Sequence, residues 1–112
     1  MTSTAPPSEV RLQAKPIYSA EWLTVGNHAV LDVSPSGNWL ARPTDIYMQM
    51  ATHIKVQALS QNIRYTIDET QASATVGFQL TAGSETLLPC PNDGISIFEE
   101  QAGAIIQYQW LR

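Results

Sequence analysis

The stretch NIRYTIDETQASATVGFQL, residues 62–80, decides the fold class that the sequence predicts. Its first part places Ile63, Tyr65 and Ile67 at every second position, with polar residues between them. Successive side chains of a β-strand point to opposite faces, so this alternation is typical of a strand with one face in a core. The polar residues 68–73 that follow favour a turn, because an Asp side chain can bind its own following backbone.

The second part of the stretch, residues 74–80, resumes the alternation and predicts the partner strand of a β-hairpin. We expect Val76, Phe78 and Leu80 to face the core from this strand. Gly77 interrupts the run, where it favours a bulge or the close approach of a neighbouring backbone.

Short segments of the same kind continue on both sides of this hairpin. The other predicted strands cover residues 17–25, 28–33, 39–41, 53–59, 86–88, 95–99 and 104–111. The clearest of them is 53–59, where Ile54, Val56 and Ala58 share one face and are expected to be buried.

The segments between the strands are predicted from their turn residues. Gly26-Asn27 favours a turn that separates the first two strands, and the Pro and Gly of residues 34–38 favour a loop. Residues 45–50 are ambiguous between strand and loop. Thr44 offers an alternative there, because a Thr side chain can cap a single helical turn.

About eight short strands, a turn signal roughly every ten residues and no convincing helix predict an all-β protein. A single sheet would leave one apolar face in water, and a second sheet packed about 10 Å away covers it. We therefore expect an antiparallel β-sandwich or a jelly-roll-like fold.

The chain of 112 residues fits one domain, which we place at residues 15–112. Residues 1–14 are rich in Pro, Ser and Thr and have no hydrophobic period, so they predict a flexible N-terminal arm. This arm is either a mobile terminus without a role or a segment that orders against a partner around Pro6, Pro7 and Arg11.

The composition disfavours several classes of function. Net charge is −4 and the six Lys and Arg residues are scattered, so a nucleic-acid surface is not expected. The sequence has no basic amphipathic stretch and no long apolar run, so membrane binding is not expected either. The N-terminus lacks the pattern of a secretory signal, and the single cysteine fits synthesis in a reducing cytoplasm.

The residues that could carry chemistry are isolated from one another. His28 and His53 have no partner at metal-ligand spacing, and Cys90 lies between two prolines without a neighbouring histidine. The adjacent acids at 68–69 and 99–100 would point apart on a strand, which is poor geometry for shared acid–base work. We expect no enzymatic activity, no catalytic residues, no cofactor and no metal.

Three Trp and four Tyr residues form the most prominent set of side chains. Aromatic residues most often pack in a core or an interface, although exposed ones on a β-sandwich can stack on sugars. Trp39 follows a loop, so it is the best candidate for exposure in this set and a candidate partner-binding residue.

The segments NIRYTIDETQASATVGFQLTAGSETLLP (62–89) and ISIFEEQAGAIIQYQW (95–110) carry a more specific pattern. The pattern resembles that of small structural proteins encoded in the morphogenesis regions of tailed bacteriophages. The matching positions are 63–68, 74–77, 80–83 and 102–103. The matching part of the chain is hairpin framework, so the resemblance carries over no binding residue.

The resemblance implies a protein of a phage particle. The small jelly-roll-like cement, staple or decoration proteins fit the length best, and they bind the outer surface of the capsid and clamp neighbouring major capsid subunits. It therefore implies the major capsid protein as partner, a homodimer or higher assembly, and a place on the capsid exterior. Two alternatives are a tail or head–tail accessory β-domain and a small carbohydrate-binding adhesin module.

Overall fold

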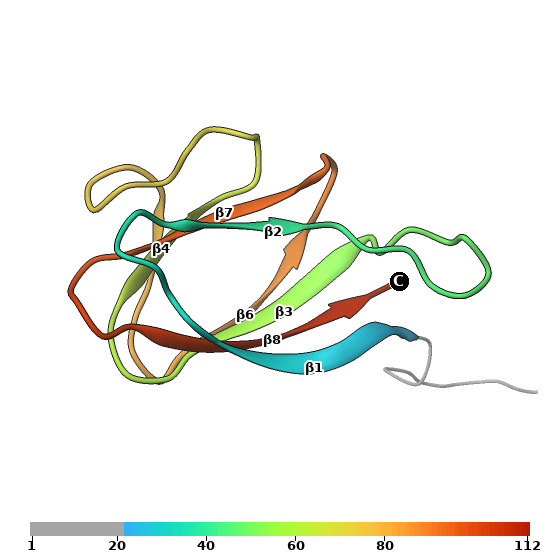
Figure 1. Ribbon diagram of the computed structural model, residues 1–112, viewed down its shortest axis with the longest axis horizontal. Helices are drawn as coiled ribbons and strands as arrows, with labels where there is room; N and C mark the ends of the chain where they lie inside the picture. The colour runs from blue at the N-terminus through green and yellow to red at the C-terminus, as the bar shows by residue number, and fades with distance from the viewer. Residues whose placement is uncertain (1–21) are drawn as a thin grey trace, which may run out of the picture.

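The computed structural model describes residues 22–112, which form two antiparallel sheets of four strands each (Figure 1). The strands are β1 (Thr24–Asp32), β2 (Asn38–Ala41), β3 (His53–Ala58), β4 (Ile63–Thr66), β5 (Phe78–Leu80), β6 (Glu85–Pro89), β7 (Gly94–Glu99) and β8 (Ile105–Leu111). No helix interrupts them in this part of the chain. The predicted all-β sandwich is confirmed, whereas the arm and residues 17–21 of the first predicted strand lie outside the described residues.

The strand order is that of a jelly roll. One sheet has the order β1-β8-β3-β6 and the other has the order β2-β7-β4-β5. β1 pairs with β8, β2 with β7, β3 with β6 and β4 with β5, as in one long hairpin that has been rolled up. The roll adds the pairings β3·β8 and β4·β7, which complete the two sheets.

The core lies between the two sheets, and most of its largest fully buried side chains are isoleucine. On β3, the alternation predicted from the sequence is confirmed, because Ile54, Val56 and Ala58 are all buried. The opposing sheet contributes Ile63 from β4 and Ile97 from β7, both fully buried. Each such side chain contributes roughly 1.5–3 kcal/mol relative to an exposed position, so these positions carry much of the fold's stability.

The predicted turn at Gly26-Asn27 is wrong, because β1 runs through it without a break. The register of β1 against β8 shifts between Val25 and Ala29, and Gly26 has φ +76°. This is a β-bulge, in which glycine adopts the left-handed conformation and the strand bends but stays paired. The two predicted strands on either side are therefore one.

The inward placement of Val76 and Phe78 is also wrong. Pairing between β4 and β5 begins only at Tyr65↔Phe78, so residues 67–77 form a long connection rather than a strand. β5 is an edge strand, and Phe78 at its start is 68% exposed, while Leu80 is buried as expected. The expectation for Gly77 is confirmed, because a Cβ there would lie 2.8 Å from the carbonyl oxygen of Tyr65.

Residues 44–50 form a loop, closed by a single bridge between Thr44 and Met50. No helical turn forms, so the alternative of a Thr44 cap is wrong. Asp45 organises the loop instead, since its Oδ1 accepts hydrogen bonds from the backbone N–H groups of Tyr47 (2.8 Å) and Gln49 (2.9 Å). A carboxylate that accepts two backbone bonds is a stronger local organiser than a hydroxyl.

Candidate functional site

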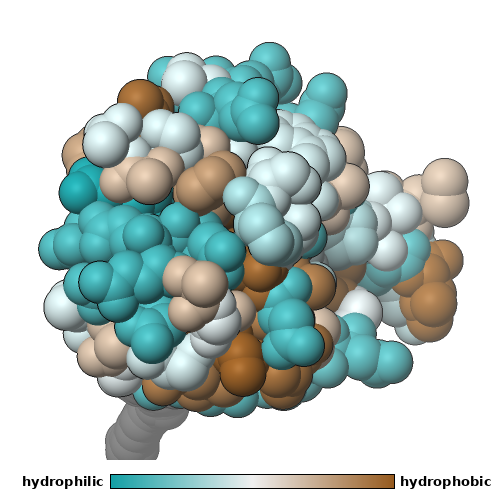
Figure 2. Space-filling model, turned by 60° about the vertical axis from the view of Figure 1, so that its left-hand side comes forward, coloured by the Kyte–Doolittle hydropathy of each residue, from teal (hydrophilic) through white to brown (hydrophobic). Residues whose placement is uncertain are grey.

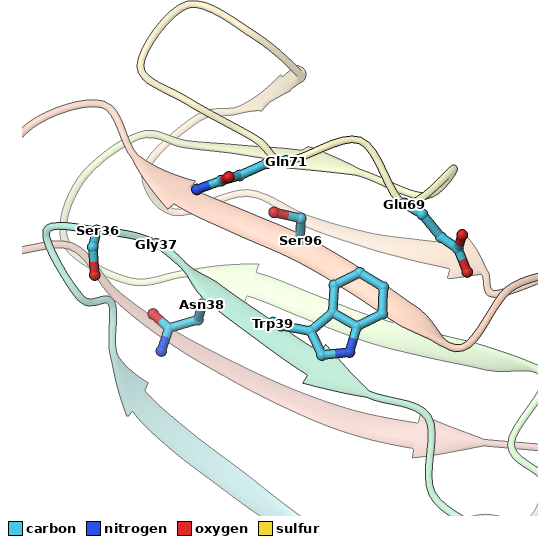
Figure 3. Close-up of a pocket in the computed structure, with 7 residues that line it drawn as sticks. All are labelled: Ser36, Gly37, Asn38, Trp39, Glu69, Gln71 and Ser96. Atoms are coloured by element: carbon cyan, nitrogen blue, oxygen red, sulfur yellow. The ribbon is translucent and has the colours of Figure 1, made fainter.

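A groove of about 270 Å³ lies on the outer side of the sheet that contains β2 and β7 (Figure 3). We call it the Trp39 groove. Its lining consists of Ser36, Gly37, Asn38, Trp39, Glu69, Gln71 and Ser96. These residues come from the 33–37 loop with the start of β2, from the 67–77 connection and from β7.

Trp39 forms an aromatic platform in this groove. Trp39 pairs with Ser96 of the neighbouring strand β7. A Cβ added to Gly94, which also belongs to β7, would lie 2.8 Å from Cζ2 and 2.9 Å from Cε2 of the Trp39 indole. The indole therefore lies directly against the Gly94 backbone, which has no side chain to hold it away. Because Trp39 is still 47% exposed, the rest of the ring faces solvent.

The 67–77 connection supplies the opposite side of the groove, and hydrogen bonds fix it to the sheet. The hydroxyl of Thr66 donates to the carbonyl of Thr70, and the N–H of Ala72 donates to Ser96 Oγ at 2.9 Å. Figure 3 shows Glu69 and Gln71 on this connection, across β7 from Trp39. The connection is thus held where these two side chains reach the groove.

The polar groups around Trp39 are available for a ligand. The side chains of Glu69 and Gln71 make no hydrogen bond within the described part of the chain. Asn38 uses its Oδ1 to accept from the N–H of Ser34 (2.8 Å), which fixes its orientation. Glu69 also has φ +72°, an uncommon conformation for a residue other than glycine. A flat ring with an amide and a carboxylate nearby can bind a hydroxylated or amide-bearing molecule.

A second surface, of different chemistry, lies at one end of the sandwich. Ile46, Tyr47 and Met48 are consecutive and are 86%, 71% and 80% exposed. We call this end, together with nearby exposed Trp22, Leu23 and Met50, the apolar end. Figure 1 shows the 44–50 loop extending past the strands beside the C-terminus, and Figure 2 shows hydrophobic surface on the projecting part of the molecule.

The apolar loop is anchored at its base. Arg112 Nε donates to Asp45 Oδ2 at 2.6 Å, while Asp45 Oδ1 holds the two backbone N–H groups of the loop. Burial alone would raise the pKa of Asp45, but the bonds from Gln49, Tyr47 and Arg112 outweigh it and lower that pKa. The loop therefore presents its apolar tip in a defined conformation.

The residues singled out for chemistry are dispersed in the structure. His28 bonds to Gln107 (3.0 Å) on the outer face of one sheet, whereas His53 contacts the ring of Trp22 at a centroid distance of 4.7 Å. No three His, Cys, Asp or Glu side chains come together as a metal site anywhere in residues 22–112. Cys90 is buried, its thiol donates to the carbonyl of Asn92, and burial raises its pKa, which disfavours a reactive thiolate.

In each adjacent pair of acids, one residue has structural partners in the described part of the chain. Glu100 accepts from Gln79 (2.9 Å) and from Arg64 (2.7 Å), and these contacts lower its pKa despite partial desolvation. Asp68 accepts from Thr70, which lowers its pKa and shapes the 67–77 connection. These acids therefore stabilise the hairpin and its connection.

The partner-binding residues predicted from the sequence divide into two groups. Trp39, the aromatic residue singled out as the best candidate for exposure, is exposed, and its role in binding stays a prediction. Pro6, Pro7 and Arg11 lie outside the described residues. Sequence reasoning missed the 46–48 tip, although three consecutive apolar residues between Asp45 and Gln49, without strand or helix period, were its signal.

Within residues 22–112 the chain has no helix long and apolar enough to cross a membrane. Comparison of the chain with protein-family models, with curated proteins and with solved structures finds no match in any of the three.

Proposed function

We propose that this chain is a non-enzymatic structural protein of a phage particle that binds the outer surface of the capsid and clamps neighbouring major capsid subunits. The resemblance of residues 62–110 to phage structural proteins directs the proposal to a virion. The jelly-roll sandwich suits the role, because the fold gives a rigid body in which loops and outer faces are free for contacts.

The observation that carries the proposal is the anchored apolar tip, Ile46-Tyr47-Met48. A run of exposed apolar residues costs solubility unless it serves a contact. This run is held by Asp45 and Arg112, so little conformational entropy is lost when it docks. An aromatic residue with flanking Ile and Met is well suited to fill a pocket at the centre of a protein interface.

The low fraction of charged residues also suits repeated contacts on a capsid lattice. Only 14% of the residues are charged, so burying surface in an assembly removes poorly solvated area. A specific contact buries about 800 Å² per partner, and several modest contacts on a repeating shell add up through avidity. The 1–14 arm is proposed as a second contact with the capsid.

The test is copurification of the tagged chain with mature particles, followed by cryo-electron microscopy. Density at icosahedral positions over the shell is expected. Density at one vertex or along the tail would replace the capsid assignment with a tail or head–tail accessory role. Absence from particles would overturn the proposal.

A matched pair of variants tests the contact surface. The double change Ile46→Ser with Met48→Ser should weaken attachment at least about tenfold, because it removes the centre of the contact. Val30→Ser removes another exposed apolar side chain, on β1 and away from this loop, and should leave attachment unchanged. Deleting residues 1–14 should weaken attachment while the sandwich still folds. If all three variants attach as well as the unaltered chain, neither the 46–48 tip nor the 1–14 arm contacts the capsid.

A further inference from the structure

We propose that the Trp39 groove is a binding site for an uncharged pyranose sugar, separate from the apolar end. The proposal stands on the geometry of the groove and does not depend on the capsid assignment. The two surfaces lie on different parts of the fold, the outer side of β2 and β7 for the groove and the 44–50 loop for the apolar end.

The first step is the aromatic platform. Trp39 lies against Gly94, where the missing side chain lets the indole approach the backbone closely. A ring held in this way keeps its position and needs no reordering when a ligand arrives. Aromatic rings of this kind offer a flat apolar face, onto which the C–H face of a pyranose ring can stack.

The second step is the polar rim. Sugar hydroxyl groups are both donors and acceptors, so a site for them needs both kinds of partner. Glu69 supplies acceptors only, while the amide of Gln71 supplies a donor and an acceptor. Both residues line the groove, and Figure 3 shows them on the connection, across Ser96 from Trp39, with their side chains extending in different directions. The volume of about 270 Å³ is just below the usual range for pockets that hold drug-sized ligands, which suits one sugar ring.

The third step is charge. Glu69 is the one ionisable residue in the groove lining, and the net charge of the chain is −4. A sugar that carries a carboxylate or sulfate would be repelled by this field. The groove therefore favours neutral hexoses and N-acetylhexosamines over sialic or uronic acids.

A purely structural role of Trp39 accounts for less of the arrangement. An indole can shield a glycine from solvent across a strand pair, and Trp39 does so for Gly94. That role does not require a hydrogen-bonded connection that brings an amide and a carboxylate beside the exposed part of the ring. It also does not require Glu69 in a left-handed conformation, and such conformations concentrate at binding sites.

The experiment is an NMR titration of the full chain with methyl glycosides of glucose, galactose, mannose and N-acetylglucosamine, each up to about 50 mM, because single-ring sugars bind at millimolar strength. The indole N–H of Trp39 is assigned with Trp39→Phe. At least one glycoside is expected to shift this signal together with amides of residues 36–39, 69–71 and 96. N-acetylneuraminic acid is expected to shift none of them.

Variants separate a binding site from a structural residue. Trp39→Ala should abolish the saturable shifts, and Glu69→Gln, which leaves the platform intact, should change affinity at least about threefold. Phe78→Ala removes another exposed aromatic ring of the same sheet and should leave the titration unchanged. If Trp39→Ala fails to fold, Gln71→Ala replaces it.

Three outcomes would overturn the proposal. They are the absence of saturable shifts with every glycoside, shifts that persist unchanged in Trp39→Ala, and loss of particle attachment in Trp39→Ala without any sugar binding. The last outcome would make the groove a protein contact. Sugar binding at the groove supports the proposal whether or not the chain attaches to particles. The capsid assignment is decided by its own experiment.

Discussion

Arg112 Nε lies 2.6 Å from Asp45 Oδ2, so the residue that follows β8 clamps the base of the apolar loop. We predict that Asp45→Ala loosens this loop, because the N–H groups of Tyr47 and Gln49 lose their acceptor. Hydrogen exchange should then accelerate at these two amides and stay unchanged in the core strands. Asp45→Asn keeps one acceptor oxygen and should protect both amides better than Asp45→Ala. Equal exchange in the two variants would contradict this account.

Acidification should destabilise the sandwich. The pKa values of Asp45, Asp68 and Glu100 are all lowered from their ordinary values of 3.8, 3.8 and 4.5. The native state therefore favours the ionised forms, and the unfolded state binds more protons once the pH falls below about 4.5. The stability that these groups contribute is complete above that pH and is lost as the pH falls through the lowered native values.

Thermal unfolding between pH 7 and pH 2.5 measures this dependence. These three groups should leave the melting temperature unchanged between pH 7 and pH 5. At pH values below about 4.5 they should lower the melting temperature. A combined Asp45→Asn and Glu100→Gln variant should be less stable at pH 7 and show a shallower decline in acid. A decline of unchanged steepness in this variant would show that other carboxylates are responsible.

Gly77→Ala should destabilise the hairpin by about 2 kcal/mol or more. The backbone of Gly77 has φ +122°, and a Cβ would meet the Tyr65 carbonyl oxygen at 2.8 Å. The cost combines a conformation that alanine disfavours with a contact that only a backbone shift relieves. Gly83→Ala is the control, because Gly83 has φ +86° but open space around it. Urea denaturation should show a smaller loss for Gly83→Ala, of about 1–2 kcal/mol.

Ile97→Ala should cost about 2–5 kcal/mol, because Ile97 is fully buried and its removal leaves a cavity between the sheets. The matched control is Val30→Ala, an exposed aliphatic residue on β1, which should change stability by less than about 0.5 kcal/mol. The shift of the denaturant midpoint measures the stability change of each variant, provided that the dependence of the unfolding free energy on denaturant concentration is unchanged. A small loss at Ile97 would show that the two sheets repack readily.

The sequence predicted those parts of the fold in which the local pattern and the burial agree. On β3, Ile54 and Val56 alternate with polar residues, and a sheet packs on one side of this strand only. The same rule failed at Phe78, because the first paired residue of an edge strand has a neighbour on one side only, the ring of Tyr65. It failed again at Gly26, where a bulge and a turn have the same residue preference and only the partner strand distinguishes them.

The candidate site was predictable only in part. The position of Trp39 after a loop indicated exposure, which the structure confirms. Its neighbours in the groove come from β7 and the 67–77 connection, which are far away in the sequence. The roll of the hairpin brings them together, and no local pattern encodes which residues will meet.

The rolled hairpin also sets the order in which the chain can fold. β4·β5 is the one pairing between consecutive strands in residues 22–112, and every other pairing joins strands separated by at least two others. During synthesis β1 leaves the ribosome first among these strands, but its partner β8 leaves last. β1 must therefore wait with unpaired backbone groups until translation of this region is complete. Closing such distant pairings is slow, so folding of this protein should begin at the 62–80 hairpin and finish with β1.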